Sequence, residues 1–136
     1  MAKVSIITLT WNKPALMLAC IDSLGTFVED KSELEWIIVN NDDDKTDDYA
    51  KRLEINGIKG IILEHDNSGC FSSMNNVASS YASGEYILFL NNDVLACSDF
   101  IPALIKCFDD PACKVAGSVL RFPNNDLQHA GVIFAD

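Results

Sequence analysis

Apolar and polar positions form two different patterns along this chain. Continuous runs of β-branched and other apolar residues predict buried strands at 3–10, 35–39, 60–64 and 85–90. The segments between them carry apolar residues every three or four positions and predict helices over 14–27, 46–55 and 70–82. Strands and helices therefore alternate, which predicts a mostly parallel sheet with helices on both of its faces.

Turn and capping residues mark several boundaries of these elements. Pro14 suits the first turn of a helix, and Gly84 is expected to cap the end of the helix before the fourth strand. The polar side chains of residues 66–69 are expected to cap the start of that helix. Ser98 or Asp99 is predicted to cap a further helix. Two more apolar strands are predicted at 114–120 and 132–134.

The length of the chain bounds its domain organisation. A length of 136 residues corresponds to one domain, so residues 1–136 are predicted to form a single three-layer α/β/α domain. The sequence stops at Phe134-Ala135-Asp136, at the end of the final predicted strand and without a closing helix, so we expect a truncated fold. A truncated sheet would expose apolar surface, which favours self-association.

Composition and charge narrow the range of partners. Apolar residues make up 49% of the chain and charged residues 22%, as in ordinary globular proteins. No apolar run is long enough for a transmembrane segment and no leader is evident, so we expect a cytoplasmic location. With 20 acidic against 10 basic residues, the net charge is -10, which disfavours nucleic acid and anionic membranes as partners. An anionic ligand would then need a divalent metal to supply positive charge.

The cysteine pattern favours free thiols. The five cysteines are Cys20, Cys70, Cys97, Cys107 and Cys113. Their number is odd, no C-x-x-C motif occurs, and only two histidines accompany them, so a zinc site is poorly supported. We therefore expect reduced thiols that serve as small, mostly apolar residues.

Polar residues follow four of the predicted strands. They are Thr10-Trp11-Asn12, Asn40-Asn41-Asp42, Asp66-Asn67-Ser68-Gly69 and Asn91-Asn92-Asp93. Each group alone is compatible with an ordinary turn, but parallel strands bring their carboxyl ends to one edge, where open α/β sheets bind ligands. The glycine-rich phosphate loops of NAD-binding and P-loop proteins are absent from the sequence. A diphosphate at this edge would therefore need a divalent ion held by a carboxylate.

Asp93 is the strongest candidate for holding such an ion. It follows a rigid apolar strand, and Mg²⁺ or Mn²⁺ combines one or two carboxylates with waters and phosphate oxygens. A helix or turn cap is its alternative role. Residues 42–48 contain five Asp in seven positions but lack the Gly and closing Glu of an EF-hand, so they predict a solvated turn before a helix. His129 is a candidate phosphate or sugar contact, or an ordinary surface histidine.

Five motifs occur in an order that resembles a known family. They are VSIITLTWNKP, WIIVNNDDDKTDD, HDNSGCFSSMNN, GEYILFLNNDV and LQHAGVIF. Together they resemble the family 2 glycosyltransferases of GT-A fold, and within them the bacterial rhamnosyltransferase-like branch of cell-surface polysaccharide biosynthesis. The resemblance covers nearly the whole chain and implies a Rossmann-like nucleotide-diphospho-sugar transferase fold. It also implies inverting, Mg²⁺- or Mn²⁺-assisted sugar transfer from a UDP- or dTDP-sugar to a hydroxyl of a saccharide or lipid-linked acceptor.

The resemblance also assigns roles by position. The residues that it implies for nucleotide binding are Thr10, Trp11, Asn12, Asn40, Asn41, Asn67, Gly69, Asn75 and Asn92. Asp93 matches the last position of the family's D-x-D motif and is implied as the metal ligand, and His129 lies in a segment near the donor. Two departures stand out. Asn40 occupies a position that is usually Asp, and Asn91 and Asn92 leave Asp93 as the only carboxylate of its motif.

The catalytic base is expected outside this chain. The family carries the carboxylate that deprotonates the acceptor hydroxyl well beyond the segment that ends at Gly131, and this chain ends five residues later. We therefore expect the base and the acceptor half beyond residue 136, and a chain that alone transfers no sugar. The alternative is a non-catalytic domain for nucleotide binding or protein interaction. Two other classes of α/β protein, receiver domains and sugar nucleotidyltransferases, are disfavoured. Each needs other residues directly after the first strand, at the positions that Thr10-Trp11-Asn12 occupies here.

Overall fold

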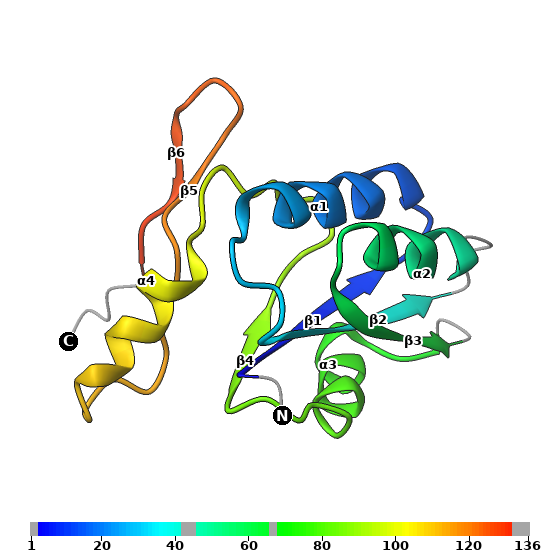
Figure 1. The fold of residues 1–136 in the computed structure, drawn as a ribbon, viewed down its shortest axis with the longest axis horizontal. Helices are drawn as coiled ribbons and strands as arrows, with labels where there is room; N and C mark the ends of the chain where they lie inside the picture. Colours follow the sequence, from blue (N-terminus) through cyan, green and yellow to red (C-terminus); the bar gives the residue numbers. More distant parts are fainter. Residues whose placement is uncertain (1–2, 42–45, 66–67, 132–136) are drawn as a thin grey trace. The chain divides into compact units, whose positions relative to one another are not determined.

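The structure is a computed structural model that describes residues 3–41, 46–65 and 68–131. The chain forms two compact units, Met1–Asp99 and Phe100–Asp136, and each is described by itself (Figure 1). The strand predicted at 132–134 and the polar residues 42–45, 66 and 67 lie outside the described residues.

A four-stranded parallel sheet forms the centre of the first unit. Its strands are β1 (Val4–Thr10), β2 (Leu34–Asn41), β3 (Lys59–His65) and β4 (Tyr86–Phe89). They lie in the order β3-β2-β1-β4, and every neighbouring pair is parallel. The four predicted strands and their parallel arrangement are confirmed, and β1 and β2 take the two central places in the sheet.

Helices cover both faces of this sheet. Helices α1 (Pro14–Phe27) and α2 (Thr46–Ile55) lie on one face, and α3 (Phe71–Ser79) lies on the other (Figure 1). Pro14 occupies the first turn of α1, as predicted, because its fixed φ suits that position and its missing N–H has no partner there. The predicted three-layer α/β/α arrangement is therefore confirmed.

The central strands are apolar because both of their faces are covered. Ile6, Trp36 and Ile38 are completely buried. On the face of α3, the apolar residues that pack together are Ile7, Ile37, Val39, Met74 and Ala78. One polar pair lies within this core: the Trp36 Nε1–H donates a hydrogen bond to the Thr8 hydroxyl at 3.0 Å, so neither buried polar group loses a partner.

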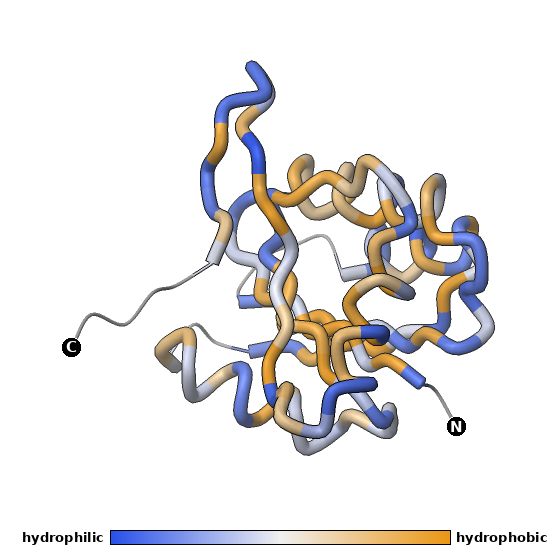
Figure 2. The backbone as a smooth tube through the Cα atoms, turned by 90° about the vertical axis from the view of Figure 1, so that its left-hand side faces the viewer, coloured by the Kyte–Doolittle hydropathy of each residue, from blue (hydrophilic) through white to orange (hydrophobic). Residues whose placement is uncertain are grey.

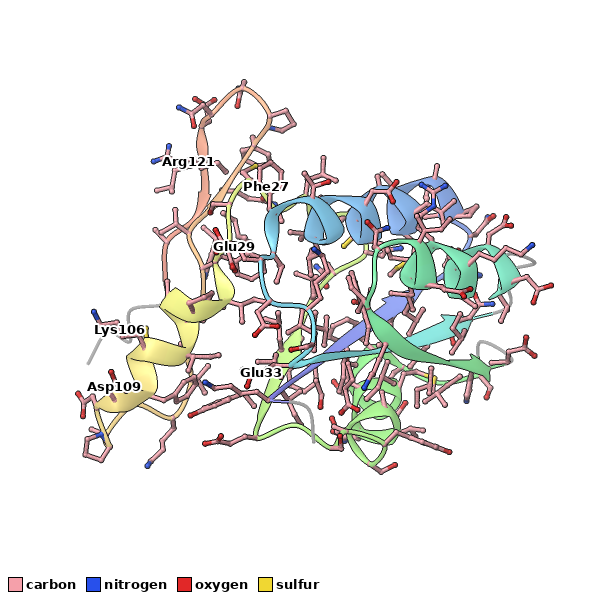
Figure 3. All side chains as sticks on the ribbon, viewed as in Figure 1. Phe27, Glu29, Glu33, Lys106, Asp109 and Arg121 are labelled. Atoms are coloured by element: carbon pink, nitrogen blue, oxygen red, sulfur yellow. The ribbon has the colours of Figure 1, made fainter. Side chains whose placement is uncertain are left out.

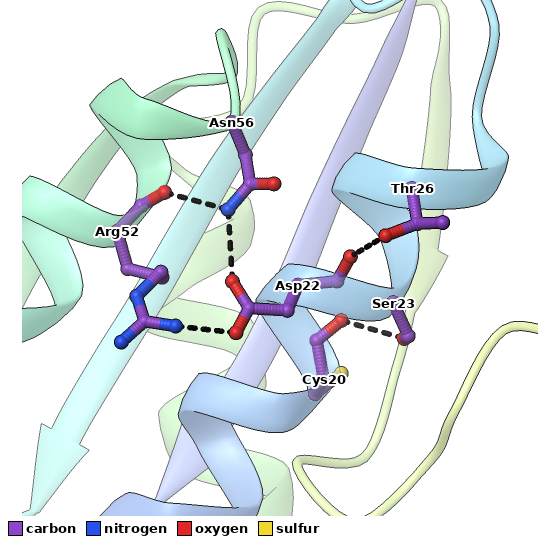
Figure 4. Close-up of polar contacts among 6 residues, drawn as sticks. All are labelled: Cys20, Asp22, Ser23, Thr26, Arg52 and Asn56. Atoms are coloured by element: carbon purple, nitrogen blue, oxygen red, sulfur yellow. Dashed lines mark hydrogen bonds and ion pairs between the residues drawn. The ribbon is translucent and has the colours of Figure 1, made fainter.

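Helices α1 and α2 approach closely at a glycine. A Cβ atom on Gly25 would lie 1.8 Å from the Oδ1 atom of Asn56, the residue just after α2, so a larger residue there would have to displace the Asn56 side chain. The close approach lets Asp22 accept a hydrogen bond from the Asn56 side-chain amide at 3.0 Å and pair with the Arg52 guanidinium (Figure 4). The two helices are thus joined by a polar contact beside their apolar one.

A carboxylate joins three segments at the amino end of the sheet. Glu35, in β2, accepts hydrogen bonds from the Ser5 hydroxyl of β1 and from the Ser83 backbone N–H at 2.6 Å and hydroxyl at 2.9 Å. The Gly84 N–H donates to the Ser5 hydroxyl at 2.8 Å. Burial opposes ionisation of Glu35, but these hydrogen bonds outweigh it and hold the pKa of the carboxyl below its usual value.

The second unit contains a short helix and a hairpin. Helix α4 (Ile101–Lys106) continues into a 3₁₀ turn, η1 (Cys107–Asp109), and an antiparallel pair follows, β5 (Leu120–Arg121) and β6 (Leu127–His129). The tip of the hairpin is polar (Figure 2). Arg121 extends from β5, and its Nη1 atom donates a hydrogen bond to the Asn125 carbonyl at 2.9 Å (Figure 3).

The structure corrects the predicted ends of α3. This helix covers Phe71–Ser79 and not 70–82, and Cys70 is its N-cap residue, without a side-chain capping bond. Gly84 is therefore not a helix cap. It is needed because a Cβ atom there would lie 2.7 Å from both the N and Oγ atoms of Ser5, in the neighbouring β1 strand.

Two further predictions after residue 97 are wrong. Neither Ser98 nor Asp99 caps α4, whose N-cap residue is Phe100, because the Asp99 carboxylate instead accepts a hydrogen bond from the Glu29 N–H at 3.1 Å. The strand predicted over 114–120 is reduced to Leu120–Arg121. An apolar run becomes a strand only where another strand pairs with it, and among the described residues only this short piece has such a partner, β6.

Candidate functional site

The polar strand ends meet at the carboxyl edge of the four-stranded sheet. Thr10 ends β1 opposite Asn40 of β2, and Asn41 is opposite His65 at the end of β3. The ladder between β1 and β4 continues one residue further, because the Leu90 N–H donates to the Ile7 carbonyl at 2.9 Å. Residues 91–93 therefore leave the sheet beside the end of β1. Edges of this kind are where open α/β sheets bind ligands.

A side-chain hydrogen bond joins the ends of β1 and β4. The Asn92 amide donates to the Thr10 hydroxyl at 3.2 Å. Thr10 is only 1% exposed, whereas Asn92 is half-buried. Both residues were predicted as nucleotide-binding on separate motifs, and the sheet brings them into contact.

Two buried asparagines end β2. The Asn40 Nδ2–H donates a hydrogen bond to the Thr46 hydroxyl at 2.8 Å, at the first residue of α2, and Asn40 is 2% exposed. Asn41 is 7% exposed, and its Oδ1 atom is buried without a hydrogen-bond partner among the described residues. An unsatisfied buried acceptor is costly, so this atom is suited to a ligand that donates a hydrogen bond.

An exposed indole follows β1. Trp11 is 58% exposed although tryptophan is usually buried, and Asn12 adopts a φ of 49°, in the left-handed region that Asn tolerates better than most residues. The turn at Asn12 leads directly into α1. An exposed aromatic ring beside buried amides offers a flat surface for stacking a base.

Asp93 presents an exposed carboxylate between anchored neighbours. The side chains of Asn91 and Asp93 are exposed, and beneath them lies the buried Cys20, whose Sγ is 3.8 Å from the Asn91 carbonyl oxygen. Burial, and secondarily the negative charge of Asp93, raises the pKa of the Cys20 thiol to about 12. The Cys20 thiol behind this segment is therefore neutral near pH 7.

The donor set fits one kind of metal site. Among the described residues, no three His, Cys, Asp or Glu side chains gather into a metal cage. Mg²⁺ and Mn²⁺ do not need such a cage, because they are typically held by one or two carboxylates, with waters and substrate phosphates as the other ligands. One exposed aspartate beside amide and carbonyl oxygens is compatible with that chemistry.

The remaining predicted residues lie further along the chain. Gly69 allows the Met74 side chain to approach, since a Cβ atom there would be 2.7 Å from the Met74 Sδ. Asn75 is buried in α3, where its amide donates to the Phe71 carbonyl at 2.9 Å. Asn67 lies outside the described residues, and His129 is an exposed residue of β6 in the second unit. Their binding roles stay predictions.

Sequence reasoning missed two residues at this edge, and one on α1 that contacts the segment after β4. Thr46 accepts the hydrogen bond from Asn40, His65 ends β3 in register with Asn41, and Ser23 of α1 accepts one from the Ala96 N–H at 3.0 Å. A hydroxyl at a helix start and a His at a strand end give a weak local signal. Ser23 gives none, because its partner is 73 residues away in the sequence.

Comparisons with known proteins agree with this geometry. The chain is 30% identical over 132 residues to the O-antigen biosynthesis protein RfbC of Myxococcus xanthus, covering 96% of this chain and 10% of RfbC. Its fold matches the mannosyltransferase PcManGT from Pyrobaculum calidifontis, solved with GDP-Man and Mn²⁺, with a TM-score of 0.73 at 21% identity over 90% of this chain and 36% of that one. S. aureus TarS 1-349 in complex with UDP matches with a TM-score of 0.67 at 24% identity, covering 79% and 32% of the two chains.

The geometry of the site and the similarity to known proteins point to one family. A parallel α/β sheet with amides and an exposed carboxylate at its carboxyl edge is a scaffold for ligands that bind beyond the strand ends. Residues 5–131 match Glycosyl transferase family 2, and the chain belongs to this family. It spans about a tenth of the length of RfbC. No helix in the described part of the chain is long and apolar enough to cross a membrane.

Proposed function

We propose that the carboxyl edge of the four-stranded sheet binds the nucleoside diphosphate of a nucleotide sugar, as the donor-binding part of an inverting glycosyltransferase. The observation that carries the proposal is the convergence of Thr10, Asn41, Asn92 and Asp93 at one edge of the sheet. The family membership supports the reaction, and the solved neighbours PcManGT and TarS were determined with GDP-Man and UDP respectively.

The base would be recognised by the end of β2 and the turn after β1. The buried Oδ1 atom of Asn41, without a partner among the described residues, is suited to the imino N–H of uracil or thymine. Cytosine presents an acceptor at the same ring position and would leave two acceptors facing each other. The exposed Trp11 would stack on the base. We therefore expect UDP or dTDP to bind better than CDP.

The diphosphate would be held through a divalent cation on Asp93. The chain carries a net charge of -10 and has no glycine-rich phosphate loop, so its own groups offer little positive charge there. Bound Mg²⁺ or Mn²⁺ would neutralise the diphosphate and stabilise it as a leaving group. Asn92, fixed by its bond to Thr10, would orient the adjacent backbone at Asp93.

Calorimetry with nucleoside diphosphates tests this proposal. UDP and dTDP in MnCl₂ are expected to bind, and EDTA is expected to abolish the binding. Asp93→Asn should act as EDTA does, whereas Asp126→Asn, which makes the same charge change at an exposed position of the second unit, should not. Equal affinity for UDP in Mn²⁺ and in EDTA, or a preference for CDP, would contradict the proposal.

The sugar and the acceptor are finer parts of the same proposal. The rhamnosyltransferase-like motifs favour a dTDP- or UDP-linked deoxy sugar, and the likeness to an O-antigen biosynthesis protein supports a saccharide or lipid-linked acceptor. Titration with dTDP-rhamnose, UDP-GlcNAc and GDP-Man distinguishes these donors. Tighter binding of GDP-Man than of dTDP-rhamnose would overturn the assignment to the rhamnosyltransferase-like branch.

The chain alone is proposed to transfer no sugar. Inversion needs a base within about 3 Å of the attacking hydroxyl, and Asp93 would be occupied by the cation. Positioned bases contribute typically 10²–10⁴-fold, and a chain without an acceptor site would also lack the proximity contribution. A product assay with radiolabelled donor checks this. Transfer within about tenfold of typical enzymatic rates of 1–10³ s⁻¹ would place the base within residues 1–136.

A further inference from the structure

We infer that Ser23, on α1, is a positioning residue for Asp93, an inference that rests on the proposed role of Asp93 in binding a cation. Ser23 lies on the side of α1 that faces the segment after β4, and it does not belong to the polar edge itself. It acts through the backbone of residues 91–96, which carries Asp93.

Helix α1 and the residues just after it contact the segment after β4 at three points. The Cys20 Sγ lies 3.8 Å from the Asn91 carbonyl, the Ser23 hydroxyl accepts from the Ala96 N–H at 3.0 Å, and Asp99 accepts from the Glu29 N–H at 3.1 Å. Glu29 follows the carboxyl end of α1 (Figure 3). Residues 91–99 form neither a helix nor a strand, so they lack the regular backbone hydrogen bonds of such an element. The three contacts hold their backbone instead.

Of the two contacts that α1 itself makes, the one at Ser23 is the stronger hydrogen bond. Its hydroxyl proton is donated to the Cys20 carbonyl at 2.8 Å, which turns the oxygen lone pairs toward the Ala96 N–H (Figure 4). Ala96 is buried, so its N–H would lose its partner if Ser23 were removed. The thiol of Cys20, by contrast, is a weak donor at a long distance.

Asp93 lies between two fixed points. On one side Asn92 is bonded to Thr10 of β1, and on the other Ala96 is bonded to Ser23 of α1. The side chain of Asp93 itself is exposed, so its position depends on the backbone that these two bonds hold. Mg²⁺ and Mn²⁺ demand near-ideal octahedral geometry, and a loosened carboxylate would bind them less well.

Three variants of α1 test the inference on the full chain. Ser23→Ala removes the acceptor, Ser23→Thr retains it, and Thr26→Ala is the matched control. Thr26 lies three residues after Ser23 in the same helix, and its hydroxyl donates to the Asp22 carbonyl at 2.8 Å. It therefore makes the same kind of intrahelical hydrogen bond as Ser23, but it has no hydrogen bond to the described residues 91–99 (Figure 4).

The first readout is amide hydrogen exchange without ligand, and the second is calorimetry with UDP in MnCl₂ and with uridine. Ser23→Ala is expected to speed exchange in a peptide covering 91–97 and to weaken Mn²⁺-dependent UDP binding about 3–10-fold, the effect of one lost hydrogen bond. Uridine lacks phosphate, so its affinity should stay unchanged. Ser23→Thr should restore both readouts, and Thr26→Ala should move neither.

The outcomes separate this inference from the proposed function. Wild-type protein that does not bind UDP in Mn²⁺ contradicts the proposed function, and the inference about Asp93 with it. Wild-type protein that binds UDP, together with a Ser23→Ala variant of unchanged exchange and affinity, overturns this inference alone. Equal weakening of uridine and of UDP by Ser23→Ala would also overturn it, since that result indicates a general loss of structure.

Discussion

The Asn92 side-chain amide donates a hydrogen bond to the Thr10 hydroxyl at 3.2 Å, across 82 positions of sequence. Thr10 is the last residue of β1, and Asn92 lies in the polar turn three residues after the end of the neighbouring strand β4. Their bond fixes the spacing of the turn that carries Trp11 relative to the turn that carries Asp93. In the proposed site, the first would contact the base and the second the diphosphate.

Replacing Thr10 tests this bond directly. Thr10→Val keeps the shape but removes the acceptor, so the Asn92 amide loses its partner and the free energy of unfolding should fall by about 1 kcal/mol. UDP affinity in Mn²⁺ should fall severalfold, because the hydrogen bond that fixes the spacing between the two turns is lost. Chemical denaturation and calorimetry measure the two effects.

Thr8→Val is the matched control for Thr10→Val. Thr8 lies in the same strand and accepts the Trp36 Nε1–H bond in the core, away from the edge. This variant should lose stability by a similar amount and keep its UDP affinity. A Thr10→Val protein that binds UDP as tightly as the wild type would show that the turns are fixed by other contacts.

The Glu35 cluster predicts a loss of stability in acid. Although burial opposes ionisation, the hydrogen bonds from Ser5, Ser83 and Gly84 lower the pKa of Glu35 in the folded state. The contribution of Glu35 to stability is therefore fully present above the unfolded pKa of about 4.3 and is lost as the pH falls through the lower, folded pKa. Urea denaturation between neutral and acidic pH follows this loss.

Glu35→Gln should remove that dependence. At neutral pH the variant is expected to unfold more easily by about 1–2 kcal/mol, since hydrogen bonds to a charged acceptor are stronger than those to an amide. Its stability should change less than the wild type's as the pH falls. Glu33→Gln, at an exposed position labelled in Figure 3, is the control and should follow the wild-type profile. Parallel profiles for wild type and Glu35→Gln would contradict the prediction.

Gly25→Ala should destabilise the contact between α1 and α2. An alanine in place of glycine normally favours a helix by roughly 1 kcal/mol, but here the new Cβ would overlap Asn56 and break its bond to Asp22. Such overpacking costs about 1–3 kcal/mol in thermal or chemical unfolding.

A double variant separates the overlap from helix propensity. In Gly25→Ala/Asn56→Gly the three nearest atoms that block the new methyl group are gone, including the Asn56 Cβ at 2.7 Å, so the added destabilisation from residue 25 should vanish or reverse. Gly117→Ala serves as a control, because a Cβ there meets nothing within 4 Å. If Gly25→Ala cost the same in both backgrounds, the contact with Asn56 would not be its cause.

The thiols should differ sharply in reactivity. All five cysteines are free, as predicted from their odd number. Hydrogen bonds from the Ser73 side chain and backbone lower the pKa of the exposed Cys70, so more thiolate is present near neutral pH. Burial holds the pKa of Cys20 near 12. Iodoacetamide should therefore label Cys70 first and Cys20 last in the folded protein.

Mass spectrometry of labelled peptides gives the order of reaction. Cys97 and Cys107 are exposed and serve as internal references. Ser73→Ala should slow Cys70 toward their rate, and labelling in urea should reach all five positions equally. Labelling of Cys20 as fast as Cys97 in native conditions would contradict the buried position of this thiol.

Local signals explain what the sequence could predict. Helix α1 was predicted with the observed bounds because Pro14 and the apolar spacing that follows are contained in the helix itself. The parallel sheet followed from alternation of strands and helices, and it brought Thr10, Asn41 and Asp93 to one edge. These predictions depend on patterns within an element or between neighbouring elements.

Contacts between distant segments explain what could not be predicted. Gly84 was interpreted as a helix cap because glycine often ends helices, but its role is to let the chain approach Ser5 of β1. Asp99 was interpreted as a cap, yet Glu29 holds its carboxylate. Ser23 gave no signal at all, since a serine in a helix reveals nothing about a segment 73 residues later.

The Glu35 cluster also bears on how freely this protein can change. It ties the strands together at the amino edge of the sheet, and Ser5 and Thr10 of the same strand are separated by roughly 17 Å of extended chain. Substitutions that far apart usually have additive effects on stability. Mutations near Ser5 and Ser83 can therefore raise or lower the free energy of unfolding without altering the residues at the carboxyl ends of the strands. Substitutions at those carboxyl ends can in turn change which donor is bound. Stability and specificity can thus evolve separately, at opposite ends of the same strands.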